Sequence, residues 1–334
     1  MKYKIHNRRY IGNKHKLLSF IDNVLNYNKV EFNSFADLFA GTGVVSEYFL
    51  SKNKSVIIND NLYSNYVFYV AWLSNLEYDK DKINNFINYY NNSMEYIKDN
   101  YFSDIFSGTY FNYNNAKQIG SIRVDIEKNR EKLNLREYCI LLSSLLYTTD
   151  KIANTCGHFE AFLAKKPQEE IFKLQDLDIK KYKYKPKIFQ ENANVLIKKI
   201  KADLVYIDPP YNSRQYINFY HLLENLAEWK QPKVFGKTLK MERNAKKSEY
   251  SKANALNNFK DLILNCNSQY VLVSYNNTYK ANSNASINKI LEKDIYDILS
   301  SVGKMEKFDI DYKYFNTGKT NFSDHKEMLF LCKI

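Results

Sequence analysis

Cysteine is scarce in this sequence, and long apolar runs are missing. Four cysteines occur among 334 residues, at positions 139, 156, 266 and 332, and they form no Cys-x-x-Cys pair and have no histidine ladder beside them. We therefore expect neither a zinc site nor a disulfide framework, and no metal. The charged N-terminal segment has no signal-like apolar core, and no stretch approaches membrane-spanning length. We expect a cytoplasmic protein with reduced thiols and no membrane association.

Acidic residues are the minority among the charges. The chain has 49 Lys and Arg against 37 Asp and Glu, a formal net charge of +12. The composition is rich in Lys, Asn, Ile and Tyr, as an AT-rich genome would produce, so the total alone is weak support for a nucleic-acid partner. Residues 1–30 and 230–252 each have an excess of six positive charges (7 − 1 and 8 − 2), which accounts for the whole excess. Such clusters suit phosphate-binding surfaces, with a solvated basic face as the alternative.

Proline is rare, and two of the five prolines are adjacent in the most informative stretch. The apolar run 202–207 predicts a buried strand, and Asp208-Pro209-Pro210-Tyr211 follows it directly. Each proline fixes its own φ and restricts the residue before it, so the Asp208 carboxylate and the Pro209 carbonyl point in set directions. Two acceptors and an aromatic ring could hold an exocyclic base amine. A stiff strand-to-loop turn is the alternative interpretation.

Glycine is also rare, yet two of the nine glycines flank Thr42 after a short apolar strand. The turn Gly41-Thr42-Gly43 lets the backbone approach a ligand closely. The next predicted strand ends in Asp60, which stands 60 − 41 = 19 positions after Gly41, the spacing at which a carboxylate can bind ribose hydroxyls. Ser46 replaces the third glycine of the dinucleotide fingerprint, so we predict a nucleoside ligand other than NAD. A surface acid at a strand end is the alternative for Asp60.

The alternation of strands and helices stops after the second strand and resumes near Pro186. Strands are predicted at 35–39, 55–60, 187–190, 202–207, 270–275 and 327–331. Helices are predicted at 16–26, 44–50, 62–76, 82–101, 122–133, 135–152, 195–200, 216–229 and 287–300, with loops at 102–120 and a mobile basic loop at 230–258. We therefore expect a doubly wound α/β sheet that is interrupted from about residue 78 by a mostly helical insertion, with ligand-binding turns at the carboxyl ends of its strands.

The ordered motifs resemble those of the alpha group of DNA adenine-N6 methyltransferases, the Dam-like enzymes. They are Arg9-Tyr10-Ile11-Gly12-Asn13-Lys14, Phe39-Ala40-Gly41-Thr42-Gly43, Asp60 and Asp208-Pro209-Pro210-Tyr211, and together they span nearly the whole chain. The resemblance implies a Rossmann-like fold that binds S-adenosylmethionine (AdoMet). Residues 1–77 and 186–334 would form the catalytic domain, and 78–185 an inserted target-recognition domain. Double-stranded DNA would be the substrate, and a cognate restriction endonuclease acting separately would be the partner.

The resemblance also assigns roles to single residues. Asp208, Pro209, Pro210 and Tyr211 match the catalytic motif. The residues assigned to the cofactor are Tyr10, Gly12, Lys14, Asp37, Phe39, Gly41, Thr42, Gly43, Asp60, Asn61, Asn192, Ala193 and Asp208. Asn192 departs from the family pattern, which often has an acid there, although an amide can still accept a hydrogen bond from the cofactor adenine.

The implied reaction is methyl transfer from AdoMet to the N6 amine of a flipped adenine. The N6 lone pair is delocalised into the ring. Hydrogen bonds from the amine to the Asp208 carboxylate and the Pro209 carbonyl, with Tyr211 stacked on the base, would counter this delocalisation. Cytosine N4, a base amine in RNA, and a DNA-binding relative without catalysis are the alternatives. The N-terminal position of the 10–14 motif and the long insertion favour adenine in duplex DNA. We expect the insertion to read bases and residues 230–252 to contact phosphates.

Overall fold

The chain divides into two compact units, each built from three chain segments. The computed structural model describes residues 2–95, 97–278, 284, 287–311 and 325–334. The sheet unit consists of Asn13–Asn61, Pro186–Tyr216 and Ala245–Ile334. The helical unit consists of Met1–Gly12, Leu62–Lys185 and Ile217–Asn244.

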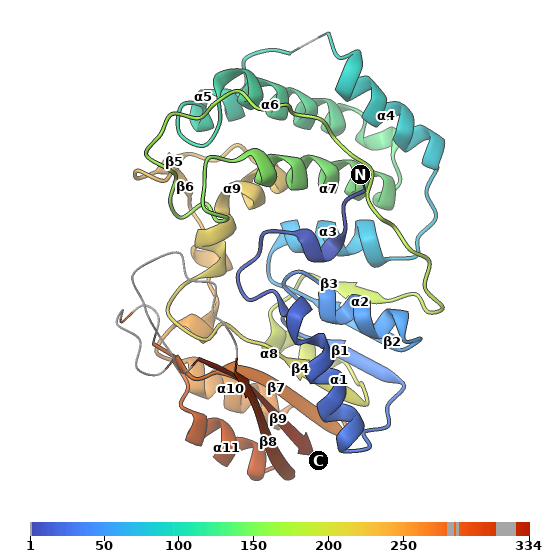
Figure 1. The fold of residues 1–334 in the computed structure, drawn as a ribbon, viewed down its shortest axis with the longest axis vertical. Coiled ribbons are helices and arrows are strands. Elements are labelled where there is room, and N and C mark those ends of the chain that lie inside the picture. Colours follow the sequence, from blue (N-terminus) through green and yellow to red (C-terminus); the bar gives the residue numbers. More distant parts are fainter. Residues whose placement is uncertain (1, 96, 279–283, 285–286, 312–324) are drawn as a thin grey trace. The chain divides into compact units, whose positions relative to one another are not determined.

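A seven-stranded, mostly parallel sheet organises the sheet unit (Figure 1). Its strands, in spatial order, are β3 (Lys187–Phe189), β2 (Ser55–Asn59), β1 (Ser34–Asp37), β4 (Leu204–Ile207), β7 (Tyr270–Asn276), β9 (Lys326–Lys333) and β8 (Lys304–Asp311). β9 is antiparallel to both of its neighbours, and the other pairs are parallel. The strand order reverses at β1, which lies between β2 and β4. In α/β sheets, ligands bind outside the carboxyl ends of the strands at such a reversal.

Helices cover both faces of this sheet, which explains the nearly continuous apolar sequence of its parallel strands. The helices of the unit are η2 (Lys14–Leu17), α1 (Leu18–Tyr27), α2 (Val44–Ser51), α8 (Ala193–Leu196), η4 (Ile197–Lys199), η6 (Glu249–Ser251), α10 (Ala255–Leu264) and α11 (Glu292–Ser300), while η5 (Asn244–Lys246) spans the unit boundary. On one face, Val205 joins a core cluster that includes Phe259 of α10 and Ile295 of α11. On the other, the ring centroid of Phe35 lies 4.3 Å from that of Phe49 in α2. The expected α/β class with a mostly parallel sheet is confirmed.

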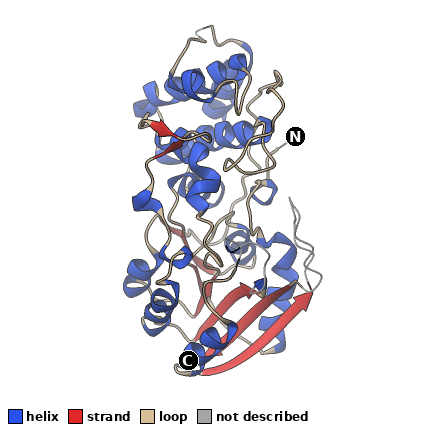
Figure 2. Cartoon of the chain, turned by 90° about the vertical axis from the view of Figure 1, so that its left-hand side faces the viewer, coloured by secondary structure: helices blue, strands red, loops and turns tan. Residues whose placement is uncertain are grey.

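The helical unit contains mostly helices and one short hairpin. Its helices are η1 (Ile5–Asn7), α3 (Tyr63–Leu73), α4 (Lys80–Asn92), α5 (Tyr101–Phe106), α6 (Tyr113–Lys128), η3 (Arg130–Lys132), α7 (Leu135–Ile152) and α9 (Tyr216–Glu228). The hairpin pairs β5 (Val234–Phe235) with β6 (Lys240–Met241) and is the short pair of strands among helices in Figure 2. No helix within the described part of the chain is both long and apolar enough to cross a membrane.

The helical unit extends beyond the predicted insertion 78–185, because α3 and α9 belong to it. Two buried charged side chains explain this difference. The Glu224 carboxylate of α9 accepts hydrogen bonds from the backbone N–H groups of Tyr63 and Ser64, both at 2.8 Å. The Arg123 guanidinium of α6 donates to the carbonyl oxygen of Leu226 at 2.9 Å. A buried charge is costly unless it is paired or hydrogen-bonded, so these contacts join α3, α6 and α9. The inserted target-recognition domain itself stays a prediction.

Several predicted elements differ from the observed ones. The predicted helix 82–101 ends at Asn92, and the predicted loop 102–120 contains α5 and the start of α6. Two asparagines begin these helices: the Asn100 side chain accepts from the N–H groups of Phe102 and Ser103, and Asn112 caps α6 in the same way. The expected mobile loop 230–258 is wrong as well, because it contains β5, β6, two short turns of 3₁₀ helix and the start of α10. Burial of Met241 and Tyr250 ties this segment to its surroundings.

Candidate active site

Two adjacent parallel strands lead into carboxylates at the same edge of the sheet. Asp37 is the last residue of β1, and Asp208 directly follows β4. Asp37 pairs with Tyr206 in the register of the two strands. Both carboxylates therefore lie where the strand order reverses, which is the ligand-binding edge of an α/β sheet.

Asp37 is a buried carboxylate with one satisfied oxygen. Its Oδ2 accepts a hydrogen bond from Ser46 Oγ at 2.8 Å, and within the described residues no hydrogen bond reaches its Oδ1. Burial raises the pKa of Asp37 to about 8, the Ser46 hydrogen bond opposes this rise, and the charges of Asp208 and Asp60 add to it. A buried acceptor of this kind is well suited to a donor group on a ligand.

The glycine turn and Asp60 form one structural feature. Gly41 and Gly43 have positive φ angles of 52° and 81°, a conformation that glycine adopts without strain. The Gly41 N–H donates to Asp60 Oδ2 at 3.0 Å, and the Gly43 N–H donates to the Ala40 carbonyl at 2.7 Å. Gly43 is also the N-cap residue of α2. The two sequence motifs that predicted a nucleoside site are thus in direct contact.

Lys14 contacts two side chains of the Asp-Pro-Pro-Tyr motif. The Lys14 ammonium lies 3.2 Å from Asp208 Oδ1 and donates to Tyr211 Oη at 2.5 Å. The Tyr211 hydroxyl in turn donates to Asp208 Oδ1. Burial would lower the pKa of Lys14, but the charges of Asp208 and Glu327 outweigh this effect and raise it. Burial raises the pKa of Asp208, against the opposing charge of Lys14. Lys14 is therefore positively charged and lies next to the Asp208 carboxylate.

Glu327 is a further member of this cluster that belongs to none of the sequence motifs. It lies near the start of β9, opposite Asn276 of β7, and its Oε2 is 3.6 Å from the Lys14 ammonium. Burial raises the pKa of Glu327 to about 7, Lys14 lowers it, and Asp208 adds to the rise. The sequence feature that could have indicated Glu327 is its position as an acid at the start of the predicted apolar strand 327–331.

Residues of two other chain segments, Lys289 and Tyr275, also contact Tyr211. Its backbone carbonyl accepts hydrogen bonds from Lys289 N at 2.7 Å and from Tyr275 Oη at 3.2 Å. Its ring meets that of Tyr275 edge-on, with the centroids 4.8 Å apart and the ring planes at 70°. These contacts fix both the backbone and the ring of the last residue in the Asp-Pro-Pro-Tyr motif.

The remaining predicted cofactor residues of the sheet unit lie around β1, β2 and α8. The Asn59 amide at the end of β2 donates to the carbonyl of Glu191 at 2.9 Å, which places Asn192 and Ala193 next to this end of the sheet. Asn192 is exposed, and its side chain accepts from Asn194 N at 2.9 Å as the N-cap of α8. Three other predicted residues lie in this unit. Thr42 is buried within the glycine turn. The Phe39 ring packs against the core cluster and meets Tyr250 edge-on at 5.1 Å, and Asn61 donates to the Lys246 carbonyl at 3.0 Å.

Tyr10 and Gly12 belong to the helical unit, whereas Lys14 belongs to the sheet unit. The ring of Tyr10 stacks on Tyr220, with centroids 4.6 Å apart and an interplanar angle of 4°. Tyr10 Oη accepts a hydrogen bond from Asn65 Nδ2 at 3.2 Å. The N-terminal motif is therefore divided between the units, and a common ligand for its two halves stays a prediction.

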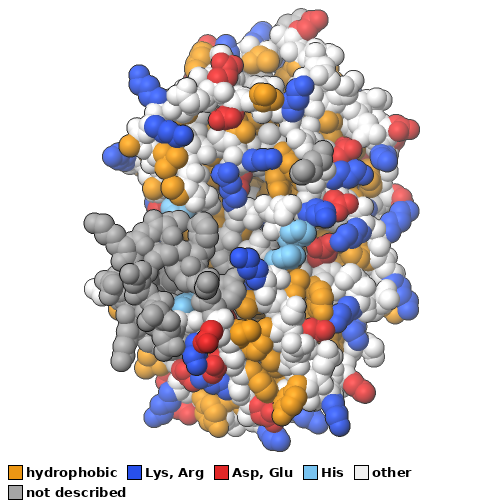
Figure 3. Space-filling view, in the orientation of Figure 1, with side chains coloured by type: hydrophobic (Ala, Val, Ile, Leu, Met, Phe, Trp, Pro, Cys, Tyr) orange, Lys and Arg blue, Asp and Glu red, His pale blue; other side chains and the backbone are white. Residues whose placement is uncertain are grey.

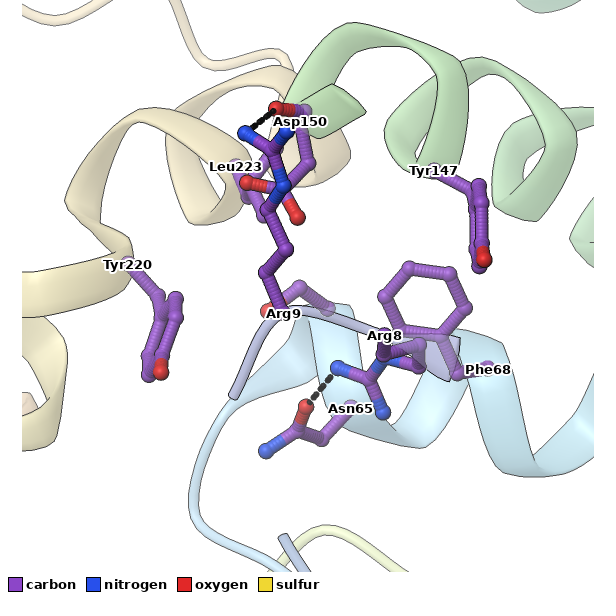
Figure 4. A pocket seen from close by; sticks show the side chains of 9 residues that line it. Arg8, Arg9, Asn65, Phe68, Tyr147, Asp150, Tyr220 and Leu223 are labelled. Atoms are coloured by element: carbon purple, nitrogen blue, oxygen red, sulfur yellow. Dashed lines mark hydrogen bonds between the residues drawn. The ribbon is translucent and has the colours of Figure 1, made fainter. Parts of the chain in front are cut away.

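A polar pocket within the helical unit adjoins this motif, and the sequence analysis did not predict it (Figure 4). Its lining residues are Arg8, Arg9, Ser64, Asn65, Phe68, Tyr147, Asp150, Tyr220 and Leu223. The Arg8 guanidinium donates to Asn65 Oδ1 at 2.6 Å and lies 3.7 Å from the centroid of the Phe68 ring. Arg9 donates to the backbone carbonyl of Asp150 at 3.1 Å. Burial raises the pKa of Asp150 to about 7, against the charges of the two arginines.

Some of the positive charges of the basic segment 230–252 are paired with acidic side chains of the protein. Lys240 pairs with Glu160 at 3.4 Å, and Lys252 pairs with Glu249 at 2.5 Å. Arg243 Nε donates to the amide oxygen of Asn218 at 2.5 Å. On the face drawn in Figure 3, Lys and Arg are spread among acidic side chains. Phosphate binding by this segment therefore stays a prediction.

Comparison with known proteins identifies the family. The family model of the D12 class N6 adenine-specific DNA methyltransferases matches residues 10–287, which include positions 10–14 of the N-terminal motif, the glycine turn and the Asp-Pro-Pro-Tyr motif. The chain belongs to this family. The predicted resemblance to adenine-N6 methyltransferases is confirmed.

Named relatives agree with this assignment. The chain is 35% identical to modification methylase LlaI of Lactococcus lactis subsp. lactis over 80% of its own length and 46% of the relative. It is 35% identical to type II methyltransferase M.FokI of Planomicrobium okeanokoites over 96% of its length and 52% of the relative. It is 32% identical to type II methyltransferase M.NlaIII of Neisseria lactamica over 95% of both chains. The chain thus spans about half the length of the first two relatives.

Proposed function

We propose that this methyltransferase transfers a methyl group from AdoMet to the N6 amine of an adenine in duplex DNA. The observation that supports this most directly is the Asp208 carboxylate, which is only 14% exposed and follows β4, the strand that pairs with β1 and so lies next to the strand leading into the glycine turn. The modification methylases among the relatives support a role in a restriction-modification system, with a separate endonuclease as the partner. A DNA substrate also supports a cytoplasmic location.

The residues of the glycine turn fit AdoMet. The Oδ1 atom of Asp37 is buried and receives no hydrogen bond from the described residues, so it can accept one from an ammonium group of the cofactor. Gly41 and Gly43 have no side chain, so a ligand can approach the backbone of the turn closely. Asp60 would accept from the ribose hydroxyls, and Asn192 from the adenine amine. Bound AdoMet would supply an electrophilic methyl group.

Asp208, Pro209 and Tyr211 would activate the substrate amine. A flipped adenine can donate the two N–H groups of N6 to the Asp208 carboxylate and the Pro209 carbonyl. These hydrogen bonds draw the nitrogen out of conjugation and leave its lone pair directed at the methyl group. The Tyr211 hydroxyl holds Asp208 Oδ1, so the carboxylate is oriented before the base arrives. Once the N–C bond forms, the nitrogen has one proton in excess, and Asp208 is placed to accept it.

Transfer of labelled methyl groups tests this function. Duplex DNA should become labelled in the presence of AdoMet, and digestion should yield N6-methyladenine. Asp208→Ala should lower the rate of transfer by at least about 100-fold, because the hydrogen bond to Asp208 matters most in the transition state. As a matched control, Asp203→Asn changes an acid before the other end of β4, where it accepts from Asn33 N and Ser34 N, and should keep most of the activity. Labelled N4-methylcytosine, labelled RNA or an active Asp208→Ala variant would contradict the proposal.

A further inference from the structure

We propose that Glu327 is a positioning residue of the amine site, which draws the Lys14 ammonium away from Asp208 when the substrate amine binds there. This inference rests on the proposed function, because it concerns the same carboxylate. It assigns a role to a side chain on β9, far along the chain from the catalytic motif.

The geometry places one ammonium between two carboxylates. Lys14 Nζ lies 3.2 Å from Asp208 Oδ1 and 3.6 Å from Glu327 Oε2, and these three side chains are only 6%, 14% and 9% exposed. An ammonium has three N–H donors. One reaches Tyr211 Oη at 2.5 Å, and the two carboxylates lie within ion-pair distance of the ammonium. Lys14 therefore has an alternative acceptor within reach whenever its contact with Asp208 weakens.

Glu327 can accept a further hydrogen bond. In the described part of the chain, no hydrogen bond reaches its Oε2, although the atom is buried. A small movement of the ammonium from Asp208 toward Glu327 would satisfy this oxygen and keep the lysine paired. Without Glu327 the same movement would leave a charged lysine buried without a carboxylate, which is unfavourable.

The substrate amine is neutral and is a weaker donor than an ammonium. Lys14 therefore competes with it for the electron density of Asp208. A negative charge at Glu327 reduces this competition, because it attracts the ammonium from the other side. Loss of that charge should leave Asp208 bound more firmly to Lys14 and slow methyl transfer, while the glycine turn continues to bind the cofactor.

The protonation state of Glu327 provides a specific readout. Its pKa is raised to about 7, so the side chain is neutral at pH 6 and charged at pH 8.5. The titratable groups that act on it are Lys14, Asp208 and Tyr211, and His325 lies two positions earlier in the chain. Its neighbours on β7 and β8, Asn276 and Ile310, do not titrate. A comparison of two variants at each pH cancels the titration of the other groups.

The test compares the wild type with Glu327→Gln and Glu327→Asp. At pH 8.5, Glu327→Gln should lower kcat for methyl transfer to DNA by about 10-fold or more, with the Kd of AdoMet changed less than about 2-fold. At pH 6 the wild type and Glu327→Gln should have similar kcat values, because Glu327 is then neutral. Glu327→Asp keeps the charge and should recover part of the rate at pH 8.5.

The control variant is Asp309→Asn. Asp309→Asn removes a carboxylate of β8 that pairs with Lys326 at 3.2 Å and is 37% exposed, and it should leave kcat unchanged at both pH values. A ratio of wild-type to Glu327→Gln kcat that is the same at pH 6 and 8.5 would overturn the role of Glu327. A wild type that transfers no methyl group to adenine would instead refute the proposed function.

Discussion

Replacing Lys14 by methionine tests how the buried charges of the site are balanced. Methionine keeps the length of the side chain but removes the ammonium that lies 3.2 Å from Asp208 and 3.6 Å from Glu327. We expect the variant to lose stability in a pH-dependent way. The loss should be small at pH 5.5 and large at pH 8.5.

The size of the expected loss of stability follows from the distance between Lys14 and Asp208. At an effective dielectric constant of about 20, two unit charges 3.2 Å apart attract each other by about 5 kcal/mol. The cost of burying the lysine offsets part of this attraction, and breaking a buried pair typically costs about 3–5 kcal/mol. We therefore expect a decrease of about 3–5 kcal/mol in the free energy of unfolding at pH 8.5.

The direction of the pH dependence follows from the two carboxyl groups. Burial raises the pKa of Asp208 and of Glu327, and the Lys14 charge opposes both rises. Without Lys14 both pKa values should rise further. A carboxyl whose pKa is raised by folding contributes stability at low pH and loses it as pH rises through its folded-state pKa. The pKa of Glu327 is about 7 already, so the variant should continue to lose stability above pH 7.

Urea unfolding at pH 5.5, 7 and 8.5 measures this effect. Lys198→Met is the matched control, because Lys198 lies at the same 3.2 Å from Asp261, but the two side chains are 50% and 43% exposed. An exposed pair of this kind contributes about 0–1 kcal/mol, with little dependence on pH in this range. A loss for Lys14→Met that is equal at all three pH values, or no larger than that of the control, would refute the reasoning.

Two further predictions concern ligand binding. Asp60→Ala should weaken AdoMet binding by about 1–3 kcal/mol through lost charge-assisted hydrogen bonds, and unchanged affinity in calorimetry would contradict the assignment of Asp60. Neutralising Lys240, Arg243, Lys246 and Lys247 together should weaken binding to all DNA sequences alike and flatten the dependence of log K on log salt by up to about four units. A salt series with an unchanged slope would show that these residues form only a solvated basic face.

The parts of the sheet that bind ligands in this family of folds were predictable from short-range patterns. β4 is an uninterrupted apolar run that Asp208 follows directly, and a strand buried on both faces produces such a run. Phe35 and Ala36 marked β1 in the same way, although the predicted strand 35–39 ends at Asp37 in the structure. The positive φ angles in the glycine turn are also a local property. These features depend on a few neighbouring residues, so the sequence alone indicates them.

The missed elements depend on contacts that the sequence does not show locally. β8 was not predicted because it is an edge strand with mostly exposed or half-buried residues, and its sequence Lys-Met-Glu-Lys-Phe-Asp-Ile-Asp has no apolar run. The extent of the helical unit depends on Glu224 and Arg123, which bind backbone groups of other helices. A charged residue in a helix pattern predicts exposure unless its distant partners are known.

In the proposed mechanism, stability and catalysis make opposite demands on the cluster around Asp208. Lys14 stabilises a buried carboxylate, but a firmly bound ammonium reduces what Asp208 can offer to a substrate amine. Burial acts in the other direction, and the raised pKa of Asp208 indicates that burial outweighs the lysine. Asp208 should therefore be a stronger acceptor than a surface carboxylate even with Lys14 beside it. A second acid at Glu327 strengthens this balance, because it adds negative charge where the lysine would otherwise dominate.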